Sequence, residues 1–360
     1  MNTNGKHAAF GREKWLMILA GVIVGAVAII LMSQGNPKNM GFCIACFLRD
    51  SAGALKLHQA PPVQSLRPEI IGLILGSFIF SLVRKEFNPR GGSSPVQRFI
   101  IGFAIMVGAL VFLGCPLRMV LRMSAGDLNA WVGLIGFVCG IYVGSIFLKK
   151  GFTLRPTHSL GVSEGIAMPA IQLVMLCLLL GGSTLLVFSE KGPGSMHAPI
   201  WLSLVLSLVV GATVQRSRLC QMGGIRDVIL LKDSTLLIRS IAMLITAMVG
   251  NLIVGNMNWS FAGQPIAHSE FIWNILGLFV VGFGSTLIGG CPLRQLVLSG
   301  TGNGDSAIAV LGMLVGAAFC HNFSLASSGE GTTPNGRIAC IAAIVVLFVI
   351  AALNLRRKEA

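Results

Sequence analysis

The chain has 360 residues, of which 54% are hydrophobic and only 11% are charged. Soluble domains usually carry about 25% charged residues, so this composition excludes a soluble globular protein and indicates an integral membrane protein. The formal net charge of +14 would suit a nucleic-acid-binding protein, but the basic residues lie in short loops and at both chain ends. That distribution is the positive-inside pattern of membrane proteins, so we expect a lipid bilayer and no nucleic acid as the partner.

The first part of the chain contains four long apolar runs. The first run, 15–32, follows Lys6, Arg12 and Lys14, so we place the N-terminus in the cytoplasm. It lacks a small-residue cleavage site and is expected to remain as the first helix. Residues 34–57 are too polar to face lipid and too apolar for an ordinary loop, which indicates a re-entrant element buried in protein. The remaining runs lie at 68–83, 99–113 and 131–148.

A single extra run, 166–188, separates this part from the next and has no counterpart on either side. One extra span reverses the orientation of everything after it. The later runs lie at 199–214, 236–257, 271–289, 306–323 and 337–355. Both termini are then cytoplasmic, the loops at Arg90 and Lys150 are internal, and the loops at Lys191 and Gly263 are external.

One pentapeptide occurs twice, as Gly114-Cys115-Pro116-Leu117-Arg118 and as Gly290-Cys291-Pro292-Leu293-Arg294. Farther upstream, Cys43 with Arg49-Asp50 matches Cys220 with Arg226-Asp227. Glycines repeat at nearly the same spacing. We therefore predict two repeats of inverted topology, 15–148 and 199–323, joined by a connector at 149–198 with one transmembrane helix. Residues 324–360 would form a last helix and a basic cytoplasmic tail.

Each pentapeptide interrupts an apolar run, which is typical of discontinuous helices around a membrane site. Proline suits the first turn of a helix, so Pro116 and Pro292 are predicted to begin half-helices. The free N–H groups at such a start attract an anion. Arg118 and Arg294 follow within one turn, near the same face. The sequence thus predicts two anion-binding cups.

The thiols indicate the nature of the ligand. A cysteine side chain is a weak donor and a soft, polarisable partner, which favours sulfur, selenium or a soft metal. Weak contacts in series suit passage of an ion, and the four repeated thiols could supply them: Cys43, Cys115, Cys220 and Cys291. The alternative without a binding function is that Gly-Cys-Pro is only a tight packing point between helices. The Arg-Asp pairs are either structural or anion-supporting.

Two other functions remain open at this stage. Cys43-Ile44-Ala45-Cys46 is a C-x-x-C, which raises the possibility of a redox enzyme passing electrons between a dithiol and a quinone. A soft-metal permease is the third reading, although no ligand cluster and no cofactor motif is evident. Four cysteines outside the repeat are expected to be small buried apolar residues: Cys139, Cys177, Cys320 and Cys340.

The paired Gly-Cys-Pro-Leu-Arg copies and the upstream cysteine in each half resemble the YeeE/YedE family of bacterial inner-membrane sulfur transporters, most of all its selenium-associated YedE branch. The resemblance implies an hourglass-shaped helical transporter and not an enzyme. In it, thiosulfate or a related sulfur or selenium species would pass a narrow midplane by S–H contacts with Cys43, Cys115 and Cys291, with Cys220 as the repeat mate of Cys43. It also implies a small cytoplasmic sulfur-carrier protein of the TusA type as a partner.

Overall fold

Proline fixes the start of five α-helices in the described part of the chain. Pro68, Pro95, Pro116, Pro292 and Pro334 each occupy the first turn of a helix. Their missing N–H has no partner in that turn in any case, and the fixed backbone angle already suits the helix. The structure is a computed structural model that describes the backbone of residues 3–355 and the side chains of residues 14–355. The predicted basic tail, Arg356-Arg357-Lys358, lies outside the described residues.

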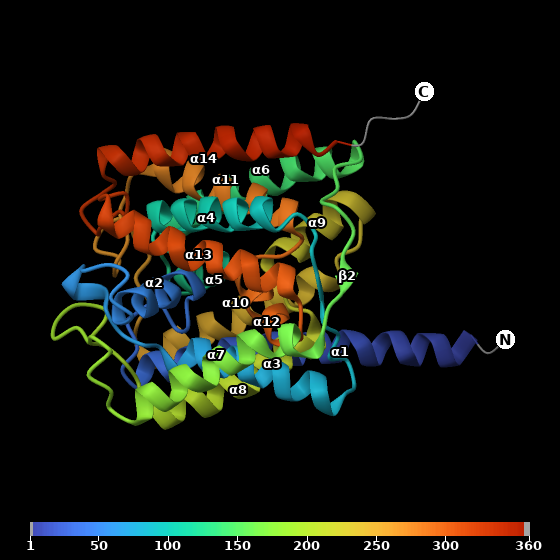
Figure 1. Ribbon diagram of the computed structural model, residues 1–360, viewed down its shortest axis with the longest axis horizontal. Helices are drawn as coiled ribbons and strands as arrows, with labels where there is room; N and C mark the ends of the chain where they lie inside the picture. Colours follow the sequence, from blue (N-terminus) through green and yellow to red (C-terminus); the bar gives the residue numbers. More distant parts are fainter. Residues whose placement is uncertain (1–2, 356–360) are drawn as a thin grey trace.

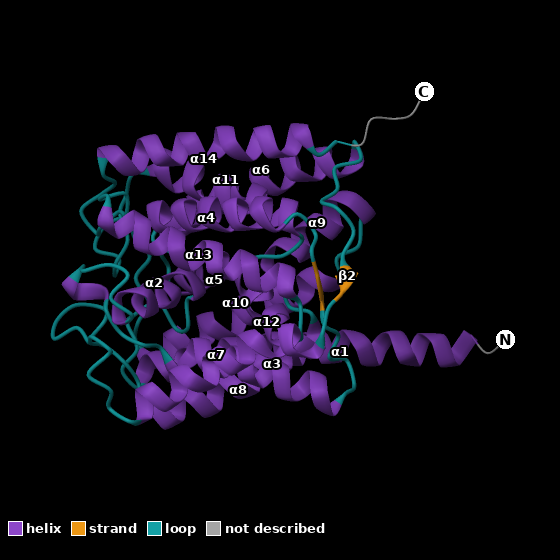
Figure 2. Ribbon diagram, viewed as in Figure 1, coloured by secondary structure: helices purple, strands orange, loops and turns teal. Residues whose placement is uncertain are grey.

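The described residues are almost entirely helical, with one pair of two-residue strands (Figure 2). In chain order the elements are α1 (Thr3–Ser33), α2 (Ile44–Ala54), η1 (Pro61–Val63), α3 (Pro68–Val83), β1 (Arg90–Gly91), α4 (Pro95–Phe112), α5 (Pro116–Ser124), α6 (Leu128–Lys149), β2 (His158–Ser159), α7 (Val162–Leu180), α8 (Ile200–Ser217), α9 (Gln221–Leu231), α10 (Thr235–Val254), α11 (Phe271–Ile288), α12 (Pro292–Gly300), α13 (Gly304–Asn322) and α14 (Pro334–Leu353).

Within the described part of the chain, ten helical segments are long and apolar enough to cross a membrane. Their outer faces expose large apolar side chains such as Ile135, Ile253 and Val349, which suits contact with lipid. This arrangement confirms the all-α polytopic membrane fold. The bounds of two helices differ from those that the sequence predicts. α1 begins at Thr3, well before the apolar run, because backbone hydrogen bonds do not require apolar side chains. α7 ends at Leu180, just before Gly181 and Gly182.

The long helices pack in four main pairs (Figure 1): α1 with α10, α3 with α8, α4 with α13 and α6 with α11. Each pair joins a helix from the first half of the chain to one from the second half. The two helices of α6 and α11 come very close at Gly136, where an added Cβ would lie 2.0 Å from the carbonyl oxygen of Ile275. Small residues allow such close approach between membrane helices.

The two ends of the helix bundle differ in charge. β1 pairs with β2, which brings the α3–α4 and α6–α7 connections together, and Phe152 pairs with Leu355 at the end of α14. α1 begins at this same end (Figure 1). We call it the basic end, because these connections carry several cations: Arg84, Lys85, Arg90, Lys150 and Arg155. At the opposite end, the Ala198 amide donates to Asn36 Oδ1 at 2.8 Å, so α8 begins beside the end of α1.

Candidate functional site

Four short helices begin directly after the repeated cysteines: α2 after Cys43, α5 after Cys115, α9 after Cys220 and α12 after Cys291. Pro116 and Pro292 begin α5 and α12, as the sequence predicts. The upstream thiols cap their helices directly. Cys43 Sγ accepts a hydrogen bond from the Cys46 amide at 3.5 Å, and Cys220 Sγ accepts one from the Gly223 amide at 3.4 Å. The upstream cysteines therefore begin half-helices as well, which the sequence indicated only as re-entrant chain.

The four thiols form two pairs inside the bundle. The Cys43 thiol donates to Cys115 Sγ at 3.7 Å, and the Cys291 amide donates to Cys220 Sγ at 3.2 Å. Each pair joins the upstream and downstream cysteine of one half of the chain. All four residues are buried, and none forms a disulfide. The structure thus brings together the cysteines that the sequence singled out.

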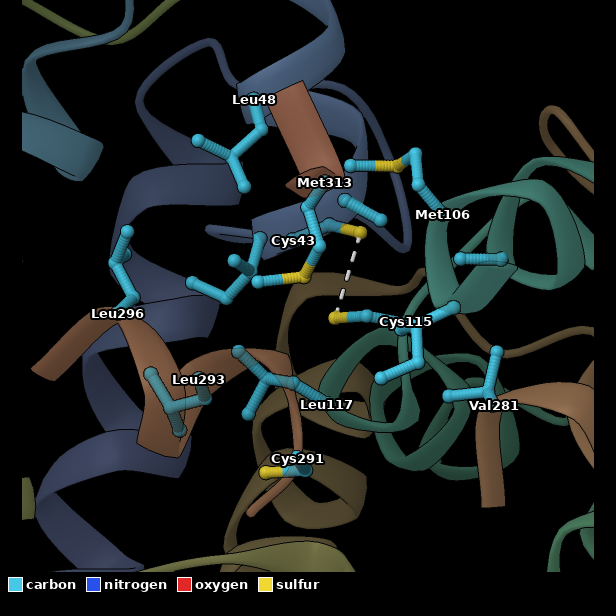
Figure 3. Packing of buried hydrophobic residues seen from close by; sticks show 14 of the residues in the cluster. Cys43, Leu48, Met106, Cys115, Leu117, Val281, Cys291, Leu293, Leu296 and Met313 are labelled. Carbon is cyan, nitrogen blue, oxygen red and sulfur yellow. Dashed lines mark hydrogen bonds between the residues drawn. The ribbon is translucent and has the colours of Figure 1, made fainter. Parts of the chain in front are cut away.

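A leucine lies between the first thiol pair and Cys291. In Figure 3, the side chain of Leu117 lies between the Cys43–Cys115 pair and Cys291, and Leu293 is drawn to one side of it. They are the leucines of the two Gly-Cys-Pro-Leu-Arg copies, and each is only 1% exposed. The side chain between the first thiol pair and Cys291 is therefore apolar and buried.

A polar vestibule of about 630 Å³ opens at the basic end. Four arginines and one glutamate supply its charge: Arg90, Arg216, Arg218, Arg294 and Glu86. Arg294 is partly exposed and donates to Gln215 Oε1 at 3.1 Å. A concave surface dominated by one sign of charge concentrates ions of the opposite sign. This vestibule therefore favours anions, and it leads to the helix that begins at Cys291.

Arg118, the repeat mate of Arg294, is bound quite differently. It is fully buried and donates to backbone carbonyls of Asn39, Leu113, Pro265 and Ile266. These carbonyls belong to three separate segments near the opposite end. Arg118 therefore ties these segments together over the Cys43–Cys115 pair, while Arg294 faces an open cavity.

His268 fixes the same closed region from outside the spans. Its Nε2 lies 2.8 Å from the Val111 carbonyl, and its Nδ1 accepts the Glu270 amide at 3.3 Å. Burial lowers the pKa of His268, and nearby Arg122 acts in the same direction. The neutral ring suits both contacts, because only a neutral imidazole has a nitrogen that accepts.

The repeated Arg-Asp pairs form ion pairs within their own helices. Arg49 and Asp50 lie 2.7 Å apart, and Arg226 and Asp227 lie 2.8 Å apart. Asp50 also binds Arg67, whose guanidinium reaches the carbonyls of two residues in the α7–α8 connection. Sequence reasoning missed Arg67. The signal was available, since an arginine next to an apolar run is costly to bury without partners.

Arg122 was missed as well. It lies inside α5, is fully buried and binds Asp127 at 2.6 Å. Its guanidinium carbon also lies over the Phe112 ring, 4.3 Å from the ring centroid.

The motif glycines have a steric role. The left-handed position at the interruption belongs to Leu113 in the first copy and to Gly289 in the second, with φ values of 63° and 79°. Gly114 and Gly290 follow directly, and a Cβ at Gly114 would come within 2.9 Å of the Arg118 side chain. The glycine thus allows the arginine side chain to fold back over the interruption.

Two of the other cysteines are not where the sequence predicted. Cys320 and Cys340 are buried as expected, but Cys139 and Cys177 are exposed. The prediction was wrong because α6 and α7 each turn one apolar face outward, and cysteine is apolar enough to stand there. Cys46 lies beside the site, with its Sγ 3.6 Å from Arg118 Nη1. Within the described residues, no group of three His, Cys, Asp or Glu side chains is arranged to hold a metal ion.

The described part of the chain forms a bundle of ten apolar segments, and broken helices meet in it around a buried polar site. These features define a multi-pass membrane protein of the transporter class. The chain belongs to the Sulphur transport family, whose sequence pattern it matches over residues 1–143 and 216–355. This membership confirms the resemblance to the YeeE/YedE family. The family description denotes transport and not catalysis.

One curated relative was found by sequence comparison. Thiosulfate transporter TsuA of Spirochaeta thermophila is 31% identical to the chain over 93 residues. The matched stretch covers 26% of this chain and 27% of that protein. The chain therefore aligns with about a quarter of the length of this relative.

Proposed function

We propose that the protein takes up a soft sulfur- or selenium-containing anion, such as thiosulfate, across the bacterial inner membrane. The anion would pass a narrow midplane by successive S–H contacts with Cys43, Cys115, Cys220 and Cys291. The observation that carries the proposal is that these thiols lie in two buried pairs at the starts of four half-helices. Helix starts attract negative charge, while thiols favour a soft atom on the same ion.

The relay is supported by the weakness of each contact. A pathway must bind an ion well enough to admit it and weakly enough to release it, and a thiol is a weak hydrogen-bonding partner. The buried leucines of the two motif copies favour a large polarisable sulfur or selenium end over a strongly hydrated hard oxyanion, because stripping water from the latter is costly. We therefore infer discrimination by softness rather than by charge.

We further propose that residues 15–148 and 199–323 are inverted repeats, with 149–198 as connector and 324–360 as the last helix and tail. Three observations support this division. α8 begins beside the end of α1, so the two first helices run in opposite directions. The packing also follows the repeat: α1 of the first repeat packs with α10 of the second, and α8 of the second repeat packs with α3 of the first. Gly126 and Gly302, at matched ends of α5 and α12, have φ values of 89° and 90°.

The basic end is proposed to face the cytoplasm, with both termini, because positive loops are retained inside. The arginine vestibule would then be the cytoplasmic exit. A TusA-like carrier is proposed to receive the anion there, on the strength of the family resemblance. A selenium species is proposed beside thiosulfate for the same reason, since the softness of the site serves both.

Uptake by cells that lack their other sulfur and selenium permeases tests the proposal. Labelled thiosulfate should accumulate, and unlabelled selenite should compete better than sulfate. If sulfate competes as well as thiosulfate does, the thiol relay is wrong. If no anion enters, transport of an anion is wrong, and a quinone-dependent dithiol activity that needs Cys46 as much as Cys43 becomes the function to measure.

A further inference from the structure

Arg239 is a buried cation without sufficient partners. It lies in the second turn of α10 and its side chain is fully buried. Among the residues that the structure describes, its Nε and Nη2 have no hydrogen-bond partner. Its Nη1 contacts the Ser217 carbonyl and lies near Met17 Sδ. A buried guanidinium with unpaired N–H groups is strongly unfavourable, so the position requires another explanation.

Arg67, in the first half of the chain, shows what full pairing of a buried arginine looks like. Arg67, directly before α3, donates to Asp50 Oδ2 at 2.9 Å and to the carbonyls of Met196 and Pro193 at 2.7 Å each. In the second half, Asp227 is bound by Arg226 alone. Asp50 thus has two arginine partners and Asp227 has one, and Arg239 contacts neither.

Arg239 lies close to the second thiol pair. The Ser217 carbonyl that it contacts is at the end of α8, shortly before Cys220. Gln215, which accepts the hydrogen bond of Arg294, lies in the same last turn of α8 as Ser217. Two guanidinium groups therefore contact the last turn of α8 beside the second thiol pair, and among the described residues neither is bound by a carboxylate.

We propose that Arg239 and Arg294, together with the N-terminus of α12, form an oxyanion site beside Cys220 and Cys291. This inference rests on the proposed function and adds to it the groups that hold the charged end of the substrate. The oxygens would bind the two guanidinium groups and the helix start, leaving the soft terminal atom toward the thiols. Arginine forms such contacts well, because its planar fork of N–H groups matches an oxyanion.

The first measurement is thermal unfolding of the full chain in detergent, with sodium thiosulfate or with sodium chloride at equal ionic strength. Thiosulfate should raise the unfolding temperature of the wild type, because a ligand that binds only the folded state stabilises it. Arg239→Met should lose this rise, yet unfold without thiosulfate at the same or a higher temperature, since a buried unpaired charge has been removed. Arg67→Met is the matched control: it should unfold earlier and keep the thiosulfate rise.

Uptake kinetics provide the second measurement. Arg239→Met should raise the KM for thiosulfate roughly tenfold or more, the change expected from loss of a binding contact. Arg239→Lys keeps the charge and should recover part of the affinity. If Arg239→Met lowers stability as Arg67→Met does and retains the thiosulfate rise, Arg239 is structural and the inference is wrong.

An internal ion pair predicts a different result. If Arg239 pairs with Asp227 in another conformation, Asp227→Asn and Arg239→Met should have equal effects whether or not thiosulfate is present, which would also overturn the inference. The proposed function fails separately, when the wild type neither takes up thiosulfate nor is stabilised by it. Wild-type uptake with an unchanged KM in Arg239→Met overturns only the oxyanion site.

Discussion

At the residue scale, a cysteine at the start of a helix is unusual. Its presence there helps to distinguish a functional role of the side chain from a purely structural one. Serine, threonine, aspartate and asparagine cap helices far more often, because an oxygen accepts the free amides better than sulfur does. Cys43 and Cys220 nevertheless occupy these positions and accept amide hydrogen bonds at 3.5 and 3.4 Å. The thiol therefore replaces a better cap, which is expected where the sulfur itself contacts the substrate.

Serine substitution tests this role of the sulfur. Cys43→Ser and Cys220→Ser should fold normally, since the hydroxyl caps the helix. Their thiosulfate uptake should fall roughly tenfold or more, the equivalent of about 1.4 kcal/mol of lost interaction. Cys115→Ala and Cys291→Ala should abolish uptake with membrane expression unchanged. Cys139→Ala and Cys177→Ala, which alter outward-facing thiols, serve as controls. If the control variants lost as much uptake as the variants of the repeated cysteines, the repeated cysteines would have only a packing role.

At the scale of helices, the repeated glycines mark where the two halves of the chain meet. Gly136 in α6 lies against the Ile275 carbonyl of α11, and Gly312 in α13 lies against the Phe99 carbonyl of α4. An added Cβ would lie 2.0 Å and 2.2 Å from these oxygens. Side-chain repacking cannot relieve a clash with backbone, so the helices themselves would have to separate.

Gly136→Ala and Gly312→Ala should therefore each destabilise the protein by about 1–3 kcal/mol, the usual effect of overpacking. The measurement is the unfolding temperature in detergent, compared with Gly161→Ala. At Gly161 the nearest atom to an added Cβ is the Ser163 hydroxyl at 3.6 Å, so this control should behave like the wild type. A wild-type unfolding temperature in Gly136→Ala would mean that α6 and α11 are not this close.

The sequence predicted the broken helices well but not their tertiary partners. Pro116 and Pro292 begin helices because proline acts locally, and the helix breaks follow from it. The contrast between Arg118 and Arg294 could not be predicted, because the partners of Arg118 come from loops far away along the chain. The exposure of Cys139 was missed because α6 is apolar on every face, so its pattern does not indicate which side meets lipid.

At the scale of the whole molecule, the two ends of the helix bundle differ in their charge and in their access to the thiol pairs. The basic end holds the arginine vestibule, and the opposite end is closed over Cys43 and Cys115 by the contacts of Arg118 and His268. The structure therefore corresponds to a state open toward the basic end. If that end is cytoplasmic, this is the state from which an imported anion leaves.

The orientation of the axis that joins these two ends is the last prediction. Lys191 and Glu330 lie in exposed connections away from the basic end, whereas Arg84 and Lys150 lie in the connections that define it. Each is replaced by cysteine in a background carrying Cys139→Ser and Cys177→Ser, which removes the exposed native thiols. In intact cells, a membrane-impermeant maleimide should label the variants at 191 and 330 only, because positive connections remain inside. After permeabilisation all four should react.

Labelling at 84 and 150 alone in intact cells would reverse the axis and make the arginine vestibule the entrance. Labelling at 191 without 330 would place these two connections on different sides and contradict the proposed inversion of the repeats.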